Sequence, residues 1–453
     1  MSRFTVEVDA WYQQEHVSRT REPLTDLAGA PRGSLGLVPR LYVSRTLRAL
    51  ADSPPLPLPE RLRAIQEAAG LFEHGSPGGE PRDAYLRALT EISGVPEETA
   101  QRSVAAVATA LRSVAAPLAA ARPSTAIQEP VPEGRPDGGV LWARRGHTFA
   151  VLAAGNTPGV HSLWPESLAL GYRVAVRPSR REPFTPRRLV RALCEAGMGA
   201  HVALLPSSYE VADHLVQEAD FSLVYGGQEV VDKYSGNPRV ILQGPGRSKI
   251  VVTADTDWRE HLETIRHSVA AMGGAACTCT SAVLVQDGHR DLARSLAEVL
   301  APSGGSAATG PAMDRSTAEG VLGLYARTAA SATPVLRPEV VPGARGGWQL
   351  TAAVSVLENA RDAALSVELP FPCVWVAPYD GELAPLRNSL VLTALTRDLG
   401  FVQKLEGEPT IRNVYAGPTP TTWMTPGVPH DGFLSEHLMG TKGVKTPPGW
   451  SLR

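Results

Sequence analysis

The sequence predicts an α/β fold with two doubly wound parallel sheets, one in each half of the chain. Short apolar runs alternate with amphipathic helical segments after residue 148, which is typical of parallel strands joined by helices. The chain has 453 residues, too many for one ordinary hydrophobic core, so two or three lobes are expected. The expected strands are at 148–154, 173–177, 201–205, 221–226, 240–242 and 249–252, and in the second half at 281–285, 353–357, 373–377 and 389–395.

Helices are expected to open the molecule. From Pro59 to Ala121 apolar residues recur at three- and four-residue spacing, which predicts helices. The following segment, 123–139, is rich in Pro, Gly and polar residues and has no period, so we expect a linker or a protruding arm. Two further helices are expected at about 257–273 and 289–300.

Composition excludes several classes of protein. The 44 basic and 46 acidic residues nearly cancel and are dispersed, so no long-range field would attract nucleic acid or an anionic membrane. No apolar run approaches the ~18 residues that a membrane-spanning helix needs. The four cysteines lack the spacing of a zinc site or a disulfide framework, so no metal is expected and a reducing cytoplasm fits best. They are Cys194, Cys277, Cys279 and Cys373.

The segment GGAACTCTSAVLV (273–285) is the first candidate for chemistry. A helix is expected to end at its two glycines, and a buried strand follows Cys277, which places a thiol at a seam between lobes. Small neighbours leave room for a substrate carbonyl, and nearby backbone N–H groups could stabilise a thiolate and an oxyanion. Cys277 is therefore a candidate nucleophile. Taken alone, the segment also fits Cys277 and Cys279 as small buried hydrophobic residues, the commoner role of a cytosolic cysteine.

Two turns after expected strands are candidates for ligand binding. The carboxyl ends of parallel strands form the binding crevice of a doubly wound sheet, and Asn156 in the turn GNTPG lies at one such end. Its side-chain amide could hold a developing oxyanion, or Asn156 could simply shape the turn. At the second turn, Gly226 and Gly227 precede a helix whose N-terminus could bind a phosphate. Glycines in such turns also occur for conformational reasons alone.

Six motifs occur in the order found in the aldehyde dehydrogenase superfamily, which the chain resembles over about residues 148–375. They are GNTPG, RPS, VYGGQEVV, GPGRSKIVV, GGAACTCT and ELPFP. Within the superfamily the sequence is most similar to acyl-CoA reductases of the bacterial bioluminescence fatty-acid reductase type. The resemblance implies that Cys277 is the nucleophile and Cys279 a bystander, and that Asn156 and the backbone N–H of Cys277 form the oxyanion hole. It also implies that Glu368, in ELPFP, binds the nicotinamide ribose.

One departure from the family pattern concerns the general base. Hydrolytic members have a glutamate where Gln243 stands here, 34 residues before Cys277 (277 − 243). An amide cannot deprotonate water, so transfer of the acyl group to or from a thiol is favoured over hydrolysis. The resemblance then implies NADPH-dependent reduction of an acyl thioester to an aldehyde through a covalent thioester on Cys277. Two alternatives stay open: NAD(P)-dependent oxidation of an aldehyde to an acid with another base, such as His161 or His267, and a non-catalytic member that holds an acyl chain.

A second departure concerns the cofactor. The resemblance makes Arg177, Ser179 and Arg180 cofactor contacts, with Arg177 where a lysine is usual and Arg180 where an acidic residue is usual. Guanidinium groups can pair with a 2′-phosphate that a carboxylate would repel, so NADPH is expected rather than NADH. The alternative is that Arg180 and Arg181 point into solvent. Gly226 and Gly227 would let the cofactor approach the backbone closely.

The expected domains follow from these assignments. Residues 1–244 are expected to form an N-terminal helical region and an NADP(H)-binding domain with an arm at about 125–147. Residues 245–430 are expected to form the catalytic domain, and 431–453 a tail in an oligomer interface. The resemblance implies a homodimer, and acyl-CoA or an acyl carrier protein as the thioester donor. Neither nucleic acid nor a membrane is expected as a partner.

Overall fold

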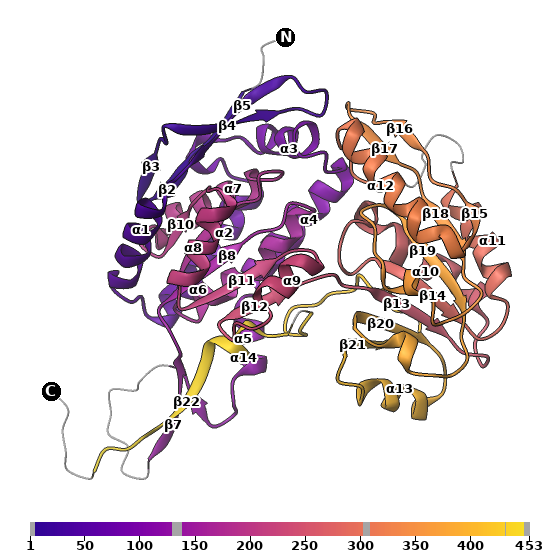
Figure 1. The fold of residues 1–453 in the computed structure, drawn as a ribbon. Helices are drawn as coiled ribbons and strands as arrows, with labels where there is room; N and C mark the ends of the chain where they lie inside the picture. Colours follow the sequence, from indigo (N-terminus) through magenta and orange to yellow (C-terminus); the bar gives the residue numbers. More distant parts are fainter. Residues whose placement is uncertain (1–4, 129–137, 302–308, 431, 448–453) are drawn as a thin grey trace.

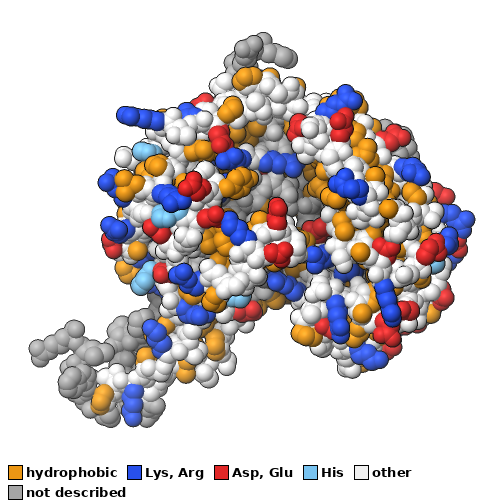
Figure 2. Space-filling model, viewed as in Figure 1, with side chains coloured by type: hydrophobic (Ala, Val, Ile, Leu, Met, Phe, Trp, Pro, Cys, Tyr) orange, Lys and Arg blue, Asp and Glu red, His pale blue; other side chains and the backbone are white. Residues whose placement is uncertain are grey.

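Two seven-stranded sheets, one in each half of the chain, organise the computed structural model (Figure 1). The structure describes residues 5–128, 138–301, 309–430 and 432–447. The space-filling view shows a hollow between the two halves, and acidic and basic side chains interspersed over the visible face (Figure 2). The predicted α/β architecture with two doubly wound sheets is confirmed.

The first sheet contains five parallel strands and, at one edge, a short antiparallel hairpin. They are β8 (Thr148–Leu152), β9 (Arg173–Arg177), β10 (Val202–Leu204), β11 (Phe221–Tyr225), β12 (Val240–Gln243), β2 (Ala10–Tyr12) and β3 (Gln14–His16). Their order is β12-β11-β8-β9-β10-β2-β3. The chain builds β9 and β10 on one side of β8, and β11 and β12 on the other. The loops after β8 and β11 therefore diverge and leave a crevice at the carboxyl ends of the strands.

Helices cover this sheet, as the near-continuous apolar character of its strands requires. The helices expected between Pro59 and Ala121 are confirmed, and others join the strands. They are α2 (Leu58–Glu73), α3 (Arg82–Glu91), α4 (Glu97–Arg112), α5 (Ala115–Ala121), α6 (Pro165–Ala169), α7 (Phe184–Leu193), α8 (Tyr209–Glu218) and α9 (Gln228–Tyr234). Within the described ranges, no helix alone has the length and apolar character to cross a membrane. Only α4 and α5 taken together pass that test, and they are bent by 58°.

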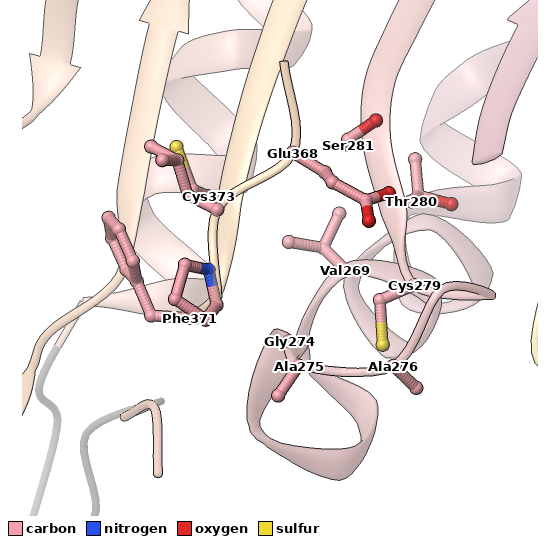
Figure 3. Close-up of a pocket in the computed structure, with 12 residues that line it drawn as sticks. Val269, Gly274, Ala275, Ala276, Cys279, Thr280, Ser281, Glu368, Phe371 and Cys373 are labelled. Carbon is pink, nitrogen blue, oxygen red and sulfur yellow. The ribbon is translucent and has the colours of Figure 1, made fainter. Parts of the chain in front are cut away.

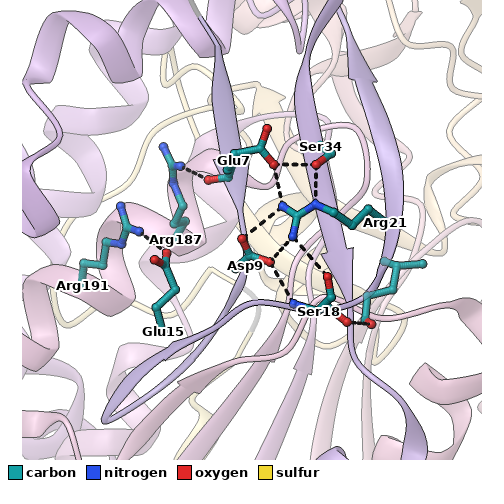
Figure 4. A network of polar contacts seen from close by, with 9 residues as sticks. Glu7, Asp9, Glu15, Ser18, Arg21, Ser34, Arg187 and Arg191 are labelled. Atoms are coloured by element: carbon teal, nitrogen blue, oxygen red, sulfur yellow. Dashed lines mark hydrogen bonds and ion pairs between the residues drawn. The ribbon is translucent and has the colours of Figure 1, made fainter.

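The N-terminus corrects the prediction that helices open the molecule. Strands β1 (Val6–Val8), β4 (Thr20–Thr25) and β5 (Pro31–Leu37) form a small sheet, and α1 (Arg40–Asp52) follows. A polar network holds this sheet together, centred on Arg21, which contacts the carboxylates of Glu7 and Asp9 (Figure 4). Strands of three residues, such as β1, β2 and β3, are too short to show a period. Strands β1, β4 and β5 pair with one another within the N-terminal segment, whereas β2 joins the first sheet, where Trp11 pairs with Leu204.

The second sheet has the order β15-β18-β19-β14-β13-β20-β21 and is parallel except for the edge strand β15. From its position in the sequence, the apolar run at 249–252 is expected among the strands of the first half. In the structure it belongs to β13, in the second sheet. The strands are β13 (Ser248–Val252), β14 (Thr280–Val285), β15 (Thr333–Leu336), β18 (Ala353–Val356), β19 (Cys373–Pro378), β20 (Ser389–Leu395) and β21 (Ile411–Ala416).

Four helices and a hairpin accompany the second sheet. The predicted helix at 289–300 is confirmed as α11, whereas the one at 257–273 is helical in α10 only over its central part, with 3₁₀ turns on both sides. The elements are α10 (Leu262–Ala270), α11 (His289–Leu300), α12 (Arg315–Thr328), α13 (Leu399–Glu406), and the hairpin strands β16 (Val340–Pro342) and β17 (Trp348–Leu350).

The expected arm and the expected C-terminal tail pair with each other. Strand β7 (Gly139–Arg144) lies between β6 (Ala126–Ile127) and β22 (Met439–Val444), and this small sheet projects from the first half (Figure 1). The short helix α14 (Leu434–Leu438) precedes β22, and the hydroxyl of Tyr172 donates to the carbonyl of Leu438 at 2.6 Å. Residues 129–137, 431 and 448–453 of the expected arm and tail lie outside the described residues. The homodimer remains a prediction.

Candidate active site

The loop that carries Cys277 has an unusual backbone. Met272, Gly273 and Gly274 have φ angles of 51°, 66° and 68°, in the left-handed region that ends a helix. A Cβ atom on Gly274 would lie 2.3 Å from the backbone nitrogen of Pro372, so only glycine fits there. The loop is therefore pressed against the segment that follows Glu368.

Cys277 is half-buried, in the loop between α10 and β14. The hydroxyl of Ser248, the first residue of β13, donates to the carbonyl of Cys277 at 2.8 Å. A Cβ atom on Gly246 would lie 1.9 Å from the same carbonyl oxygen. The motif GPGRS therefore holds the backbone of the candidate nucleophile from one side.

Asn156 meets this loop from the first sheet. It lies in the turn after β8, and its Nδ2 donates to the carbonyl of Ala275 at 3.0 Å. An amide –NH₂ group has two hydrogens, so one N–H remains for a substrate oxygen. The structure thus brings together the two residues that the sequence predicts for attack and oxyanion binding.

A pocket lies against the same loop and contains the predicted ribose ligand, Glu368 (Figure 3). The carboxylate points from the loop before β19 toward β14, and its Oε2 accepts the backbone N–H of Arg247 at 2.9 Å. Burial raises the pKa of Glu368, while that N–H and the charges of Arg247 and Lys249 oppose the rise. The lining residues are Val269, Gly274, Ala275, Ala276, Cys279, Thr280, Ser281, Glu368, Leu369, Pro370, Phe371 and Cys373.

Cys279, rather than Cys277, lines this pocket, so its reactivity matters. Its thiol is buried and donates to the carbonyl of Ala271 at 3.1 Å. Burial raises the pKa of Cys279 to about 12, so almost no thiolate exists at neutral pH. This agrees with its predicted role as a bystander. Across the described residues, the cysteines form no disulfide, and no group of three potential metal ligands comes together.

Lys249 is a residue of this region whose role the sequence did not indicate. It interrupts the buried strand β13, and its Nζ donates to the carbonyls of Arg247 and Arg387, both at 3.2 Å, and to Ser389 Oγ at 2.9 Å. Burial lowers its pKa to about 8. By holding the carbonyl of Arg247, Lys249 supports the backbone N–H that Glu368 accepts. A lysine inside an otherwise apolar strand was the available signal.

No carboxylate occupies the position of the expected base. Gln243 ends β12 and is buried, and its Nε2 has no hydrogen-bond partner among the described residues. His161 is fully buried, its Nδ1 accepts the indole N–H of Trp164 at 3.0 Å, and burial lowers its pKa to about 3. Full burial and this low pKa argue against His161 as the alternative base. His267 is half-buried on α10.

The two glycines after β11 differ in their surroundings. A Cβ atom on Gly226 would lie 2.5 Å from the side chain of Val230, whereas Gly227 has open space around its α-carbon and directly precedes α9. Gln228, the first residue of α9, accepts from Arg247 Nη2 at 2.8 Å through its Oε1. The start of α9 is therefore tied to the loop that holds Glu368. Phosphate binding at these glycines stays a prediction.

The predicted adenosine contacts lie at the end of β9, beside the Asn156 turn. A Cβ atom on Gly155 would lie 2.3 Å from Ser179 Oγ, so the loops after β8 and β9 touch. Arg177 is buried, donates to the carbonyl of Ser207, and has its guanidinium 5.0 Å from the centre of the Tyr209 ring. The structure therefore brings Arg177 and Ser179 to the crevice.

Arg180 and Arg181 diverge. Arg180 forms an ion pair with Glu22 at 3.0 Å, and Arg181 reaches the carbonyl of Ala312 in the second half at 3.5 Å. The alternative in which both point into solvent is wrong for Arg180, which is ion-paired, whereas Arg181 is exposed apart from this long contact. The contact between Arg180 and a carboxylate of the N-terminal sheet could not be predicted, because Glu22 and Arg180 are far apart in the chain.

Comparison with known proteins decides the family. The model of the aldehyde dehydrogenase family matches residues 44–381, more than half of the chain. This chain belongs to the aldehyde dehydrogenase family. It has the aldehyde dehydrogenase fold.

Curated aldehyde dehydrogenases match only part of the chain. The 5-carboxymethyl-2-hydroxymuconate semialdehyde dehydrogenase of Escherichia coli is 26% identical over 146 residues, which are 30% of this chain and 31% of that protein. Betaine aldehyde dehydrogenase of Bacillus subtilis is 26% identical over 156 residues, 32% of this chain and 31% of that protein. The matched stretches thus span about a third of these relatives.

Solved aldehyde dehydrogenases share the fold over nearly the whole chain. The NAD-dependent aldehyde dehydrogenase of Sinorhizobium meliloti superimposes with a TM-score of 0.81 at 18% identity, covering 100% of this chain and 97% of that one. An NAD⁺ complex of the Bacillus cereus aldehyde dehydrogenase gives a TM-score of 0.79 at 16% identity, covering 98% of this chain and 97% of that one.

Proposed function

We propose that this aldehyde dehydrogenase family member reduces an acyl thioester to an aldehyde with NADPH, through a covalent thioester on Cys277. The buried amide of Gln243 is the observation that carries the proposal. A family member that hydrolyses its acyl-enzyme needs a base near the cysteine, and an amide has no basic site. Exchange of the acyl group with a second thiol needs no activated water.

The chain's own groups support each part of this chemistry. The Cys277 thiolate attacks the thioester carbonyl, and the oxygen, now negatively charged, accepts from the Asn156 amide and the Cys277 backbone N–H. Collapse expels the donor's thiolate, which takes up a proton, and leaves the acyl group on sulfur. After reduction of the acyl carbon, the C–S bond breaks, the aldehyde leaves, and the thiolate is restored. Ser248 and Gly246 fix the Cys277 backbone throughout.

The residues present suit a nicotinamide dinucleotide. Glu368 offers a buried carboxylate to a ribose, Gly227 leaves open space at the start of α9, and Arg180 keeps an Nε without a hydrogen-bond partner in the described part of the chain. Arg177 and Ser179 complete the adenosine side. When bound, the reduced cofactor supplies hydride to the acyl carbon.

The substrate side chain is proposed to lie along the C-terminal loops. The rings of Tyr415 and Trp423 pack edge to face, with their centres 5.3 Å apart, and line an open groove with Ala416 and Pro418. The loop between them is joined to the catalytic segment, because the hydroxyls of Thr421 and Thr280 are 3.0 Å apart. An aromatic groove on a loop that contacts the segment after Cys277 suits an apolar or aromatic acyl group.

A second candidate function is the oxidation of an aldehyde to an acid. The names of the curated relatives favour it, since each describes an enzyme that acts on an aldehyde or semialdehyde. In that case a group other than Gln243 must activate water.

For the thioester reaction we propose acyl-CoA or an acyl carrier protein as the donor. We also propose a homodimer formed through the arm.

One experiment separates the candidates. Purified protein is given NADPH with a panel of acyl-CoA thioesters, and in parallel NADP⁺ or NAD⁺ with the matching aldehydes, with and without CoA. Thioester-dependent NADPH oxidation with aldehyde and free thiol as products supports the proposal. Acid formation without a thiol identifies the second candidate. If neither thioester reduction nor aldehyde oxidation is detected, a non-catalytic role for the chain is favoured.

A further inference from the structure

The N-terminal sheet places a carboxylate in the region predicted to bind the cofactor's adenosine. Glu22 is on β4, and its Oε1 lies 3.0 Å from Arg180 Nη2. Both side chains are about one third exposed, so solvent and a ligand can reach the pair. The carboxylate that is missing at position 180 is thus supplied in space from a different part of the chain.

Glu22 belongs to a small charged cluster built on an exposed tyrosine. The Tyr209 ring has the Arg177 guanidinium 5.0 Å and the Arg180 guanidinium 4.8 Å from its centre. Glu22 also acts on Arg177, because its negative charge opposes the fall in the pKa of Arg177 that burial causes. The cluster therefore contains two guanidinium groups and one carboxylate.

The cluster lies where a ligand of the first sheet is expected. Arg177 is the last residue of β9, and Ser179 touches Gly155 in the turn after β8. The carboxyl ends of neighbouring parallel strands border the crevice of a doubly wound sheet. In the proposed function, this end of the crevice holds the adenosine ribose.

We propose that Glu22 is a specificity-determining residue that weakens the binding of cofactors with a 2′-phosphate. The inference rests on the proposed function only in placing the adenosine ribose at the end of β9. In the free protein the Glu22 carboxylate is ion-paired with the Arg180 guanidinium. A 2′-phosphate must displace this carboxylate to bind Arg180, whereas a 2′-hydroxyl can bind while the Glu22–Arg180 pair stays intact.

Charge explains the direction of the effect. A phosphate monoester carries nearly two negative charges at neutral pH and is repelled by a carboxylate at short range. With Glu22 turned away, Arg177 and Arg180 provide two positive charges, and the unpartnered Nε of Arg180 provides a further donor. The backbone of Glu22 is held by pairing with Leu35 of β5, so the displacement is a side-chain rotation.

The test measures cofactor binding without catalysis. NADPH and NADH are titrated separately into the protein, and binding is followed by quenching of tryptophan fluorescence. Glu22→Gln keeps the size of the side chain and removes its charge. We expect it to tighten NADPH binding about tenfold and to change NADH binding less than about twofold. Arg180→Gln should weaken NADPH binding and abolish the effect of Glu22→Gln in the double variant.

Glu15→Gln is the matched control. Glu15 is also on an N-terminal strand, β3, and pairs with an arginine of the first half, Arg191, at 2.9 Å (Figure 4). Removing its charge should leave both affinities unchanged. The inference is overturned if Glu22→Gln does not tighten NADPH binding selectively, or if Glu15→Gln has the same effect. If the protein binds both cofactors but Glu22→Gln has no selective effect, only the role of Glu22 is wrong and the proposed function stands. If the protein binds neither cofactor, the proposed cofactor site is wrong too.

Discussion

Gly246 lies so close to Cys277 that a Cβ atom at position 246 would be 1.9 Å from the Cys277 carbonyl oxygen and 2.9 Å from its Cβ. The first of these distances is far shorter than a van der Waals contact. The carbonyl oxygen is a backbone atom, so it cannot move aside by a side-chain rotation. The position of the nucleophile is therefore defined by a segment that precedes it by some thirty residues and begins the second sheet.

Gly246→Ala should consequently displace the Cys277 backbone. A shift of about 1 Å at a reacting group can reduce turnover by about 100-fold, and we expect a loss of that size. Turnover and thermal unfolding are measured together. Gly70→Ala is the control, because Gly70 is exposed on α2 with open space at its Cβ position, and alanine there should be neutral or slightly stabilising. Full activity of Gly246→Ala would contradict the close contact.

The two neighbouring cysteines should differ sharply in reactivity. At pH 8, iodoacetamide should label Cys277 at least ~100-fold faster than Cys279, whose pKa of about 12 leaves very little thiolate. Peptide mass spectrometry of quenched samples measures both rates. Cys277→Ala should abolish turnover, whereas Cys279→Ala should retain it. Rapid labelling of Cys279 in the folded protein would show that the pocket thiol has been assigned the wrong role.

Gln243→Glu should convert part of the reaction to hydrolysis. The new carboxylate replaces an Nε2 that has no hydrogen-bond partner in the described structure, and burial raises its pKa, which makes it a stronger base. With an aldehyde and NADP⁺ or NAD⁺ but no thiol, acid formation should rise at least ~10-fold over the wild type. Gln243→Leu should give no gain. High acid formation by the wild type would mean that another base already acts.

Glu166 should make stability depend on pH. It is buried on α6, accepts a backbone hydrogen bond from Ser435 of α14, and burial raises its pKa from 4.5 to about 8. Between these values the folded state keeps a proton that the unfolded state has lost, so the free energy of unfolding falls as pH rises from about 4.5 to about 8.

Glu166→Gln removes this pH-dependent loss of stability, because the amide stays neutral and can still accept a hydrogen bond from the Ser435 N–H. We expect the variant to be more stable than the wild type at pH 9 by several kcal/mol, at about 1.4 kcal/mol for each unit by which the pKa is raised, and the two to converge near pH 4. Urea unfolding at both pH values measures the difference. An equal difference at the two pH values would show that the carboxyl group does not titrate in this range.

Trp423→Ala should separate substrates by the size of their acyl group. The ring forms one wall of the groove with Tyr415, so KM for aromatic or long-chain substrates should rise about 10-fold, and KM for a two-carbon substrate should change little. Met424→Ala is the comparison, since Met424 is exposed and does not line the groove. An equal loss for all substrates would point to a structural effect on the loop.

Much of the scaffold could be predicted because its signals are local. The runs at 173–177 and 389–395 coincide with β9 and β20, since strands buried on both faces must be apolar throughout. Gly274 was recognisable as part of a turn because its backbone conformation excludes other residues. The strands before residue 40 could not be found in this way, because they are short or largely polar, and pairing with other strands, rather than their own pattern, makes them strands.

By itself, the sequence determined the two-sheet architecture, the family resemblance, and the candidate roles of Cys277, Asn156 and Glu368, because periodicity and motif order are written along the chain. Only the tertiary structure decided which polar groups face one another. It buried Cys279 and His161, left Gln243 without a partner for its Nε2 among the described residues, and set Glu22 against Arg180. The reason is physical: burial and Coulomb interactions depend on distance in space, and residues remote in the chain supply them.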